Sequence, residues 1–376
     1  MQDVRPTSLL DLTQGRLEGC QRCDQNIAGR CTMMAEMVAD IVSQPDRSCP
    51  NGLWPGEVPH KWLPSTIQRI CASTGNLRVL LQFPHGMGDH VQLTTVLLHL
   101  REYRPRLVVD VACRAGCENL FVGLCHRVWR IGEPITEEFD AVIPLWWYEM
   151  RQTYPDSPST KAERCLREVF RISPNPRLCR YVCHVSSYDR ISATDYLRRI
   201  HATNRAVLIH PRGRCGSRMK DLSDQAVKQV ANTIRELGAI PIVLDWDGHA
   251  LNADWGPVEN VGADANLWPQ RVGEAGRLAA LAEQSRLCVG IDSGPGHVFG
   301  AMKTPTLIYW KHLHPVNYFG LADHVTHLVP TGHGRYIRGD RTIGETYFAA
   351  HYRHHIYSRI ESELSHHIRE KLKDVA

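Results

Sequence analysis

The run Arg277–Trp310, RLAALAEQSRLCVGIDSGPGHVFGAMKTPTLIYW, decides the fold class of this chain. It predicts a helix over GRLAALAEQS (276–285), a buried strand over RLCVGID (286–292), a glycine-rich turn, a second helix that starts near His297, and a strand over TPTLIYW (304–310). Strands that alternate with helix-length segments are typical of βαβ units, in which parallel strands lie side by side. The run therefore predicts an α/β protein with a mostly parallel sheet.

The same alternation continues upstream of this run and forms two series. The later series begins with a strand over AVLIHP (206–211), a helix over SDQAVKQVANTIRELG (223–238) and a strand over IPIVLDW (240–246). The earlier series has LRVLLQF (77–83), a helix from about Gly88 to Tyr103, and LVVDVAC (107–113). Each series predicts one doubly wound unit. We therefore expect a Cys-rich module over 1–65, a Rossmann-like domain over 76–200, a second Rossmann-like domain over 204–330 and a helical tail over 331–376.

The composition excludes several classes of protein. The 376 residues are 43% hydrophobic and 22% charged, which is the balance of an ordinary globular protein with room for two domains. The formal net charge is +4 without a basic tail or stripe, so nucleic acid is not an expected partner. No stretch of about 18 apolar residues occurs, and the first residues do not resemble a signal peptide. These observations predict a cytoplasmic protein without a membrane span.

The first candidate site is FPHGMGDH (83–90), at the carboxyl end of the first predicted strand. A glycine-rich turn at this place lets the backbone approach a ligand, and the N-terminus of the following helix attracts anions. The spacing is not GxGxxG, so a dinucleotide site is not indicated. Asp89 is either an N-cap or first-turn acid of the helix, or a general base beside a cleft.

The second and third candidate sites are the corresponding turns of the later series. The loop Ile209–Ser223 holds four basic groups, two glycines and a serine, which suit a pyrophosphate, although a solvated basic loop is the alternative. Within it, Ser223 is expected to cap the following helix. The turn GIDSGPGH (290–297) places hydrogen-bond donors at a helix N-terminus and predicts a phosphate-binding turn.

Three runs in this order resemble the ADP-heptose heptosyltransferases of glycosyltransferase family 9. They are GMGDHVQLTTVLLHLREYRP (86–105), LIHPRGRCGSRMKDLSDQAVKQVANTIRELGAIPIVL (208–244) and the opening run over 277–310. The resemblance covers roughly residues 78–320. It implies two facing Rossmann-like domains, the GT-B arrangement, with the acceptor held by the first domain and the nucleotide sugar by the second. It also implies transfer of a sugar with inversion and without a catalytic metal.

The resemblance also implies roles for residues of the three turns. Asp89 would deprotonate the acceptor hydroxyl, and Lys220 would meet the pyrophosphate of a nucleotide-diphosphate sugar that is ADP-heptose-like. The implied donor-binding residues are Arg214, Ser217, Lys220, Asp292, Ser293, Gly294 and His297. A carboxylate base and cationic groups beside a departing diphosphate are sensible chemistry for such a transfer. The acceptor is not implied, because the loop 211–219 is more basic than the family pattern and holds Cys215.

Four cysteines near the N-terminus form a separate pattern that these heptosyltransferases lack. Cys20, Cys23, Cys31 and Cys49 are spaced as C-x2-C-x7-C-x17-C. Four thiolates suit a tetrahedral zinc site, or iron. A segment with little apolar core needs a structural metal of this kind to be stable. The alternative is four unrelated reduced thiols. The role of such a module would be structural or in acceptor docking, because four thiolates leave no open position for catalysis.

Two other functions remain open from the sequence alone. One is a non-catalytic nucleotide- or sugar-binding protein whose Cys-rich module docks a partner. The other is a nucleotide-sugar epimerase, which uses the same fold but needs no acceptor. The presence of Asp89, Lys220 and Asp292 together favours the transferase, because a protein that only binds has no need of a base.

Overall fold

The computed structural model describes most of the chain after residue 74. The described residues are 75–131, 135, 137–145, 160–213, 220–246, 253–268, 274–310, 315, 322–330, 355–358 and 363–374. Nearer the N-terminus, the backbone of three short strands is described: β1 (Asn26–Ile27), β2 (Arg30–Cys31) and β3 (Glu36–Met37), paired in antiparallel order. None of the helices within these ranges is long and apolar enough to cross a membrane.

The first of two α/β units is built on a parallel sheet of four strands in the order β6-β5-β4-β7. The strands are β4 (Leu77–Phe83), β5 (Leu107–Cys113), β6 (Arg127–Arg130) and β7 (Ala141–Pro144). Alternate residues of β4, namely Val79, Leu81 and Phe83, are fully buried and pack in one apolar cluster with the helix that follows. The turn after β4 is therefore fixed to a rigid strand.

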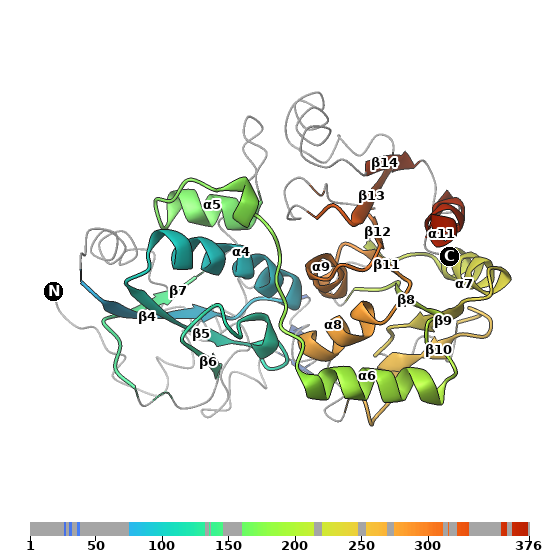
Figure 1. Ribbon diagram of the computed structural model, residues 1–376, viewed down its shortest axis with the longest axis horizontal. Coiled ribbons are helices and arrows are strands. Elements are labelled where there is room, and N and C mark those ends of the chain that lie inside the picture. The colour runs from blue at the N-terminus through green and yellow to red at the C-terminus, as the bar shows by residue number, and fades with distance from the viewer. Residues whose placement is uncertain are drawn as a thin grey trace.

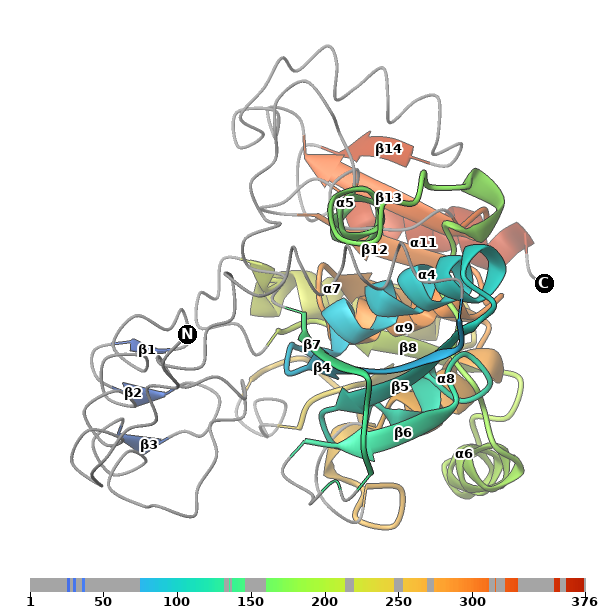
Figure 2. The ribbon, with the colours of Figure 1, turned by 90° about the vertical axis from the view of Figure 1, so that its left-hand side faces the viewer.

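That helix, α4 (Met87–Tyr103), is enclosed on nearly every side. The first sheet lies on one side of it and α5 (Lys161–Glu168) on the opposite side (Figure 1), an arrangement also visible from the side in Figure 2. Every residue from 90 to 97 is buried. Because a helix that is covered all round needs no single apolar stripe, its apolar residues are spread around its circumference.

The second unit has a seven-stranded parallel sheet in the order β10-β9-β8-β11-β12-β13-β14. The strands are β8 (Ala206–His210), β9 (Ile240–Val243), β10 (Glu259–Asn260), β11 (Leu287–Ile291), β12 (Thr306–Tyr309), β13 (Val325–Pro330) and β14 (His355–Ser358). All residues of β8 and β11 are buried, as expected for central parallel strands with helices on both faces.

Four helices cover the two faces of this second sheet. They are α7 (Asp224–Glu236) and α11 (Glu363–Asp374) on one face, and α8 (Ala275–Glu283) and α9 (Gly294–Ala301) on the other (Figure 1). The face that carries α8 and α9 shares one continuous apolar cluster with α4 and the first sheet. The two units are therefore joined by a buried contact.

The end of the chain adds a strand and a helix to the second unit. Within the predicted helical tail, the segment His355–Ser358 is instead strand β14, which pairs with β13. Residues Leu364, Ile368 and Leu372 of α11 are buried and recur at every fourth position, so this helix packs on α7 through one stripe. Arg369 also bonds Glu236 of α7 at 2.6 Å.

The connection between the units runs along α4 before it reaches α6 (Ser187–Arg199). The backbone N–H of Asn175 donates to His99 Nε2 at 2.8 Å, and that of Val182 donates to Thr94 Oγ1 at 3.2 Å. These two bonds pin the connection to the surface of α4.

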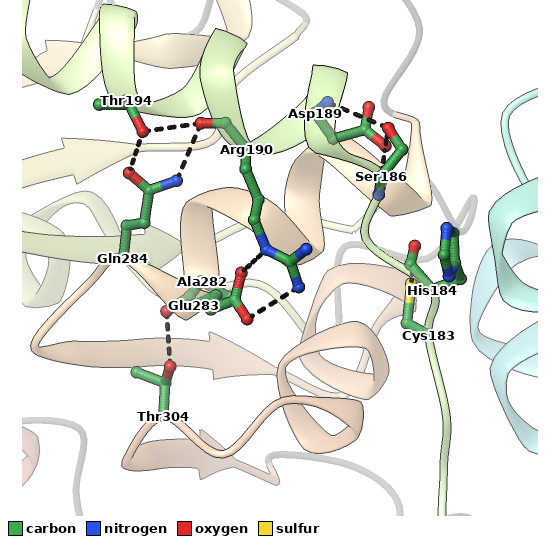
Figure 3. Close-up of polar contacts among 10 residues, drawn as sticks. All are labelled: Cys183, His184, Ser186, Asp189, Arg190, Thr194, Ala282, Glu283, Gln284 and Thr304. Carbon is green, nitrogen blue, oxygen red and sulfur yellow. Dashed lines mark hydrogen bonds and ion pairs between the residues drawn. The ribbon is translucent and has the colours of Figure 1, made fainter.

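Helix α6 lies within the range 76–200 that was predicted for the first domain, yet it packs against α8 of the second unit. Arg190 Nε donates to Glu283 Oε2 at 2.8 Å, and Thr194 Oγ1 donates to Gln284 Oε1 at 2.8 Å (Figure 3). A capping box at Ser186 and Asp189 starts the helix. A local signal thus fixes where α6 begins, whereas its packing partner comes from a part of the chain about a hundred residues away.

A second close approach between the units lies at the start of α8. The Ala275 N–H donates to the Gly116 carbonyl at 2.7 Å. A Cβ on Gly276 would stand 2.0 Å from Asn119 Nδ2, which itself donates to Asp189 at 2.9 Å. The absence of a side chain at Gly276 therefore lets the first turn of α8 reach the first unit.

Candidate active site

The two predicted glycine turns meet where the units join. Helix α4 begins after Gly86, and helix α9 begins after Ser293; neither helix has a side-chain cap at that residue. A Cβ placed on Gly88 would stand 2.9 Å from His297 Cδ2 and 3.5 Å from Gly294 Cα. The first turns of α4 and α9 are therefore in contact, one from each unit (Figure 1). Two helix N-termini at one place favour an anionic ligand there.

This contact gives a prediction for Gly88. Gly88→Ala is expected to lower the free energy of unfolding by about 1–3 kcal/mol, because the added methyl forces His297 or α9 to move. Gly86→Ala is the matched control in the same turn, since a Cβ there meets nothing closer than Asp89 Oδ2 at 4.0 Å. Its cost should be at most about 1 kcal/mol, from the poorer N-cap. Denaturant unfolding of both variants measures the difference, and equal costs would contradict the close contact.

Asp292 is the centre of a buried charged cluster at the end of β11. Its side chain is 6% exposed; Oδ2 accepts a hydrogen bond from Lys220 Nζ at 2.5 Å, and Oδ1 lies 3.7 Å from His297 Nε2. Burial by itself raises the pKa of Asp292, but the charge of Lys220 and the interactions with His297 outweigh it and lower the pKa to about 2. Asp292 is therefore an anion at neutral pH and holds both Lys220 and His297 at the N-terminus of α9.

Ser293 and Gly294 complete this turn. The Ser293 hydroxyl donates to the Ile291 carbonyl at 3.3 Å, which ties the residue back to β11. A Cβ on Gly294 would stand 3.0 Å from Met87 Cβ, so this position also contacts the first unit. The predicted donor-turn residues Asp292, Ser293, Gly294 and His297 are thus brought together with Lys220 at the junction.

The basic loop is described at its two ends. The Leu222 N–H donates to the Pro211 carbonyl and the Gly213 N–H donates to Asp221 Oδ1, both at 2.9 Å, so the ends are closed into a stem. This stem presents Lys220 to Asp292. Ser223 accepts from the Ala226 N–H at 3.2 Å and caps α7, as the sequence predicted. Arg214 and Ser217, which were predicted to bind the donor, lie outside the described residues.

Asp89 lies in the first turn of α4, but it is not the N-cap, which is Gly86. Its Oδ1 accepts a hydrogen bond from Lys161 Nζ at 2.5 Å. The lysine is the first residue of α5, 72 positions further along the chain. The described chain thus has two carboxylate–lysine pairs next to the α4–α9 contact, Asp89–Lys161 in the first unit and Asp292–Lys220 in the second.

The two histidines of the first turn support its shape. His90 Nδ1 donates to the Gly86 carbonyl at 2.9 Å, and its Nε2 accepts from the Arg114 N–H at 3.4 Å. His85 Nε2 donates to the Leu145 carbonyl at 3.0 Å. Burial lowers the pKa of His90 to about 3, so this ring is neutral at physiological pH. These bonds hold the backbone of the turn.

Lys161 and Tyr181 are site residues that the sequence did not indicate. Lys161 follows a segment without a recognisable motif, and Tyr181 lies in the connection between the units, where its ring centroid is 5.7 Å from that of His297. No local spacing relates either residue to the glycine turns. Both reach the site because α5 and the connection pack along α4.

The predicted metal ligands Cys20, Cys23 and Cys49 lie outside the described residues, and Cys31 is described in its backbone alone. Where side chains are described, no group of three or more His, Cys, Asp or Glu could hold a metal ion. The four-cysteine site therefore stays a prediction.

Solved structures of glycosyltransferases are similar to this fold. A glycosyl transferase family 9 protein from Veillonella parvula matches with a TM-score of 0.59 at 14% identity, over 81% of this chain and 99% of that chain. The ADP-heptose lps heptosyltransferase II of E. coli matches with a TM-score of 0.56 at 15% identity, over 79% and 99%. The dodecameric iron-containing heptosyltransferase TibC, solved in complex with ADP-D-beta-D-heptose, matches with a TM-score of 0.52 at 11% identity, over 80% and 78%. The sequence itself matches no protein-family model and no curated protein.

At these identities the likeness concerns the fold. The described chain has a fold like that of glycosyltransferase family 9, with two α/β units built on parallel sheets. The prediction of parallel α/β units is therefore confirmed, while the Cys-rich module lies largely outside the described residues.

Proposed function

We propose that this protein is an inverting glycosyltransferase that moves a heptose-like sugar from a nucleoside diphosphate to an acceptor hydroxyl. The observation that carries the proposal is the contact of Gly88 with His297 and Gly294, which puts the turn of Asp89 against the turn of Asp292. A base on one side and cations with a helix N-terminus on the other are what such a transfer requires. The neighbours named as heptosyltransferases, one of them solved with ADP-heptose, support this class of donor.

In the proposed reaction, the acceptor oxygen bonds the anomeric carbon from the face opposite the diphosphate. The bond between that carbon and the diphosphate oxygen breaks, and its electron pair leaves with the diphosphate. The hydroxyl proton passes to Asp89. Lys220, His297 and the N-terminus of α9 stabilise the negative charge on the leaving group, so Lys220 exchanges part of its interaction with Asp292 for phosphate oxygens. None of these roles requires a metal.

The two units divide the substrates in this proposal. The second unit holds the nucleotide sugar through Lys220, Asp292, Ser293, Gly294 and His297, with Arg214 and Ser217 from the same loop. The first unit holds the acceptor. We further propose that the four N-terminal cysteines hold a structural zinc or iron ion, and that the reaction takes place in the cytoplasm.

A thermal-shift panel of ADP, GDP, UDP and their sugar conjugates tests the donor site. One nucleoside diphosphate is expected to stabilise the protein selectively, by about 2.7 kcal/mol at a hundred times its dissociation constant. Asp292→Asn should remove this response, because Lys220 and His297 lose the carboxylate that holds them.

The control for the panel is an exposed aspartate–lysine pair of the same length, away from the site. Asp254 and Lys228 also lie 2.5 Å apart, but they are exposed on the surface. Asp254→Asn should therefore keep the full response to the nucleotide. The donor assignment fails if no nucleotide stabilises the parent protein, or if both variants respond equally.

A further inference from the structure

Lys161 carries a buried positive charge. Nothing in helix α5 itself requires a cation at this position. Its side chain is 9% exposed, and its ammonium bonds Asp89, whose side chain is 19% exposed. Burying an ammonium costs free energy unless it is paired, and a buried pair seldom adds net stability. An apolar side chain of similar size at position 161 could therefore pack as well as the lysine does, so protein stability alone does not account for the charge.

The place of Lys161 in its helix is also electrostatically unfavourable. It is the first residue of α5, directly after the N-cap Thr160, and cations prefer the opposite end of a helix. The helix already has a complete capping box between Thr160 and Glu163. A residue that breaks local rules in this way is expected at a functional site.

We propose that Lys161 is the positioning residue for Asp89, and that it holds one oxygen of the carboxylate so that the other faces the acceptor hydroxyl. This inference rests on the proposed transfer with Asp89 as the base. Oδ1 of Asp89 bonds Lys161 Nζ, whereas Oδ2 lies on the side of Gly86, 4.0 Å from the place of a Cβ there. The lysine thereby fixes the side-chain rotamer of Asp89 and places a positive charge beside the carboxylate that is to take the proton.

Among the described residues, the charged groups near Asp89 other than Lys161 are engaged with partners of their own. Arg164 lies one turn further along α5 and pairs with Glu168 at 3.3 Å. His90, the next residue of α4, is a neutral ring held by backbone bonds. His297 of α9 contacts Gly88 and lies 3.7 Å from Asp292. Removal of the Lys161 charge should therefore be felt directly by Asp89.

The first test follows the side-chain carboxyl carbon of Asp89 by NMR as the pH is lowered, in the whole protein without substrate. In Lys161→Met the acid dissociation constant of Asp89 is expected to fall about tenfold or more, and Lys161→Arg should restore most of the difference. Lys161→Gln takes the place of the Met variant if that variant does not fold. An unchanged titration midpoint in the neutral variant overturns the proposal.

The second test measures hydrolysis of ADP-heptose over a range of pH, a reaction in which water accepts the heptosyl group, Asp89 takes its proton and ADP is released. Lys161→Met should lower kcat about 10- to 100-fold with little change in the KM for ADP-heptose, and should move the acid limb of the profile together with the NMR midpoint. Lys228→Met removes the exposed lysine of the Asp254 pair and should change neither quantity.

The two tests separate the positioning role from the proposed function. If the midpoint moves while kcat and the acid limb stay, the ion pair is structural and the positioning role is wrong. If ADP-heptose is not hydrolysed by the parent protein and does not raise its unfolding temperature either, the proposed transfer from ADP-heptose is wrong. In that case the NMR titration still decides whether the ammonium group of Lys161 stabilises the ionised form of the Asp89 carboxylate.

Discussion

Asp89→Asn is expected to lower sugar transfer about a thousandfold while the affinity for the nucleoside diphosphate stays as in the parent protein. The amide has the shape of the carboxylate and still accepts a hydrogen bond from Lys161, but it does not take up the acceptor proton. General-base catalysis contributes about 10²–10⁴-fold to such steps. Donor affinity is spared because the Lys220–Asp292 cluster belongs to the other unit.

Initial rates of nucleoside diphosphate release and the ligand-induced thermal shift measure these two effects separately. The variant leaves the buried Lys161 without a counter-charge, so its unfolding must be followed to confirm that it is native at the assay temperature. Asp195→Asn, at an exposed aspartate paired with Arg198, is a suitable control and should transfer sugar normally. Normal turnover of Asp89→Asn would show that another group accepts the proton.

The free energy of unfolding should fall as the pH is lowered from about 6.5 to 3, by as much as about 5 kcal/mol, because of His90. Burial lowers the pKa of this fully enclosed ring to about 3, and the charge of Arg114 acts in the same direction against the hydrogen bond to Gly86. The unfolded chain takes up a proton on His90 below its ordinary pKa of 6.5, whereas the native protein does not until about pH 3. The unfolded state therefore binds more protons than the native state throughout this range. Its free energy falls relative to that of the native state as the pH is lowered.

Denaturant unfolding at several pH values tests this prediction. His90→Asn keeps a donor near the Gly86 carbonyl but does not titrate, so the variant should be less stable at pH 7 and lose much of the dependence on pH. Burial lowers the pKa of His99 too, so a dependence on pH of the same sign remains in this variant. His184→Asn, at an exposed histidine, should keep the full slope. Identical slopes for parent and His90→Asn would show that the ring is hydrated or charged in the native state.

The sequence by itself determined the α/β class and the places of the main turns. Alternation of buried strands with amphipathic helices records which residues are covered, and this pattern is local. In parallel sheets, the residues after neighbouring strands gather at one edge. This geometry favours a ligand site at the turns, and the resemblance to glycosyltransferase family 9 implied that Lys220, Asp292, Ser293, Gly294 and His297 form one donor site. The local sequence alone predicted Ser223 as a helix cap.

Only the tertiary structure decided which distant segments complete the site. The bond of Lys161 to Asp89, the packing of α6 on α8 and the addition of β14 to the second sheet all join residues that no spacing in the sequence relates. A local pattern states that a side chain is buried or that a helix begins, but not against what it packs. The partner is fixed by the way whole helices fit together, as where Gly88 lets α4 touch α9 and the carboxylate of Asp89 meets a lysine from α5.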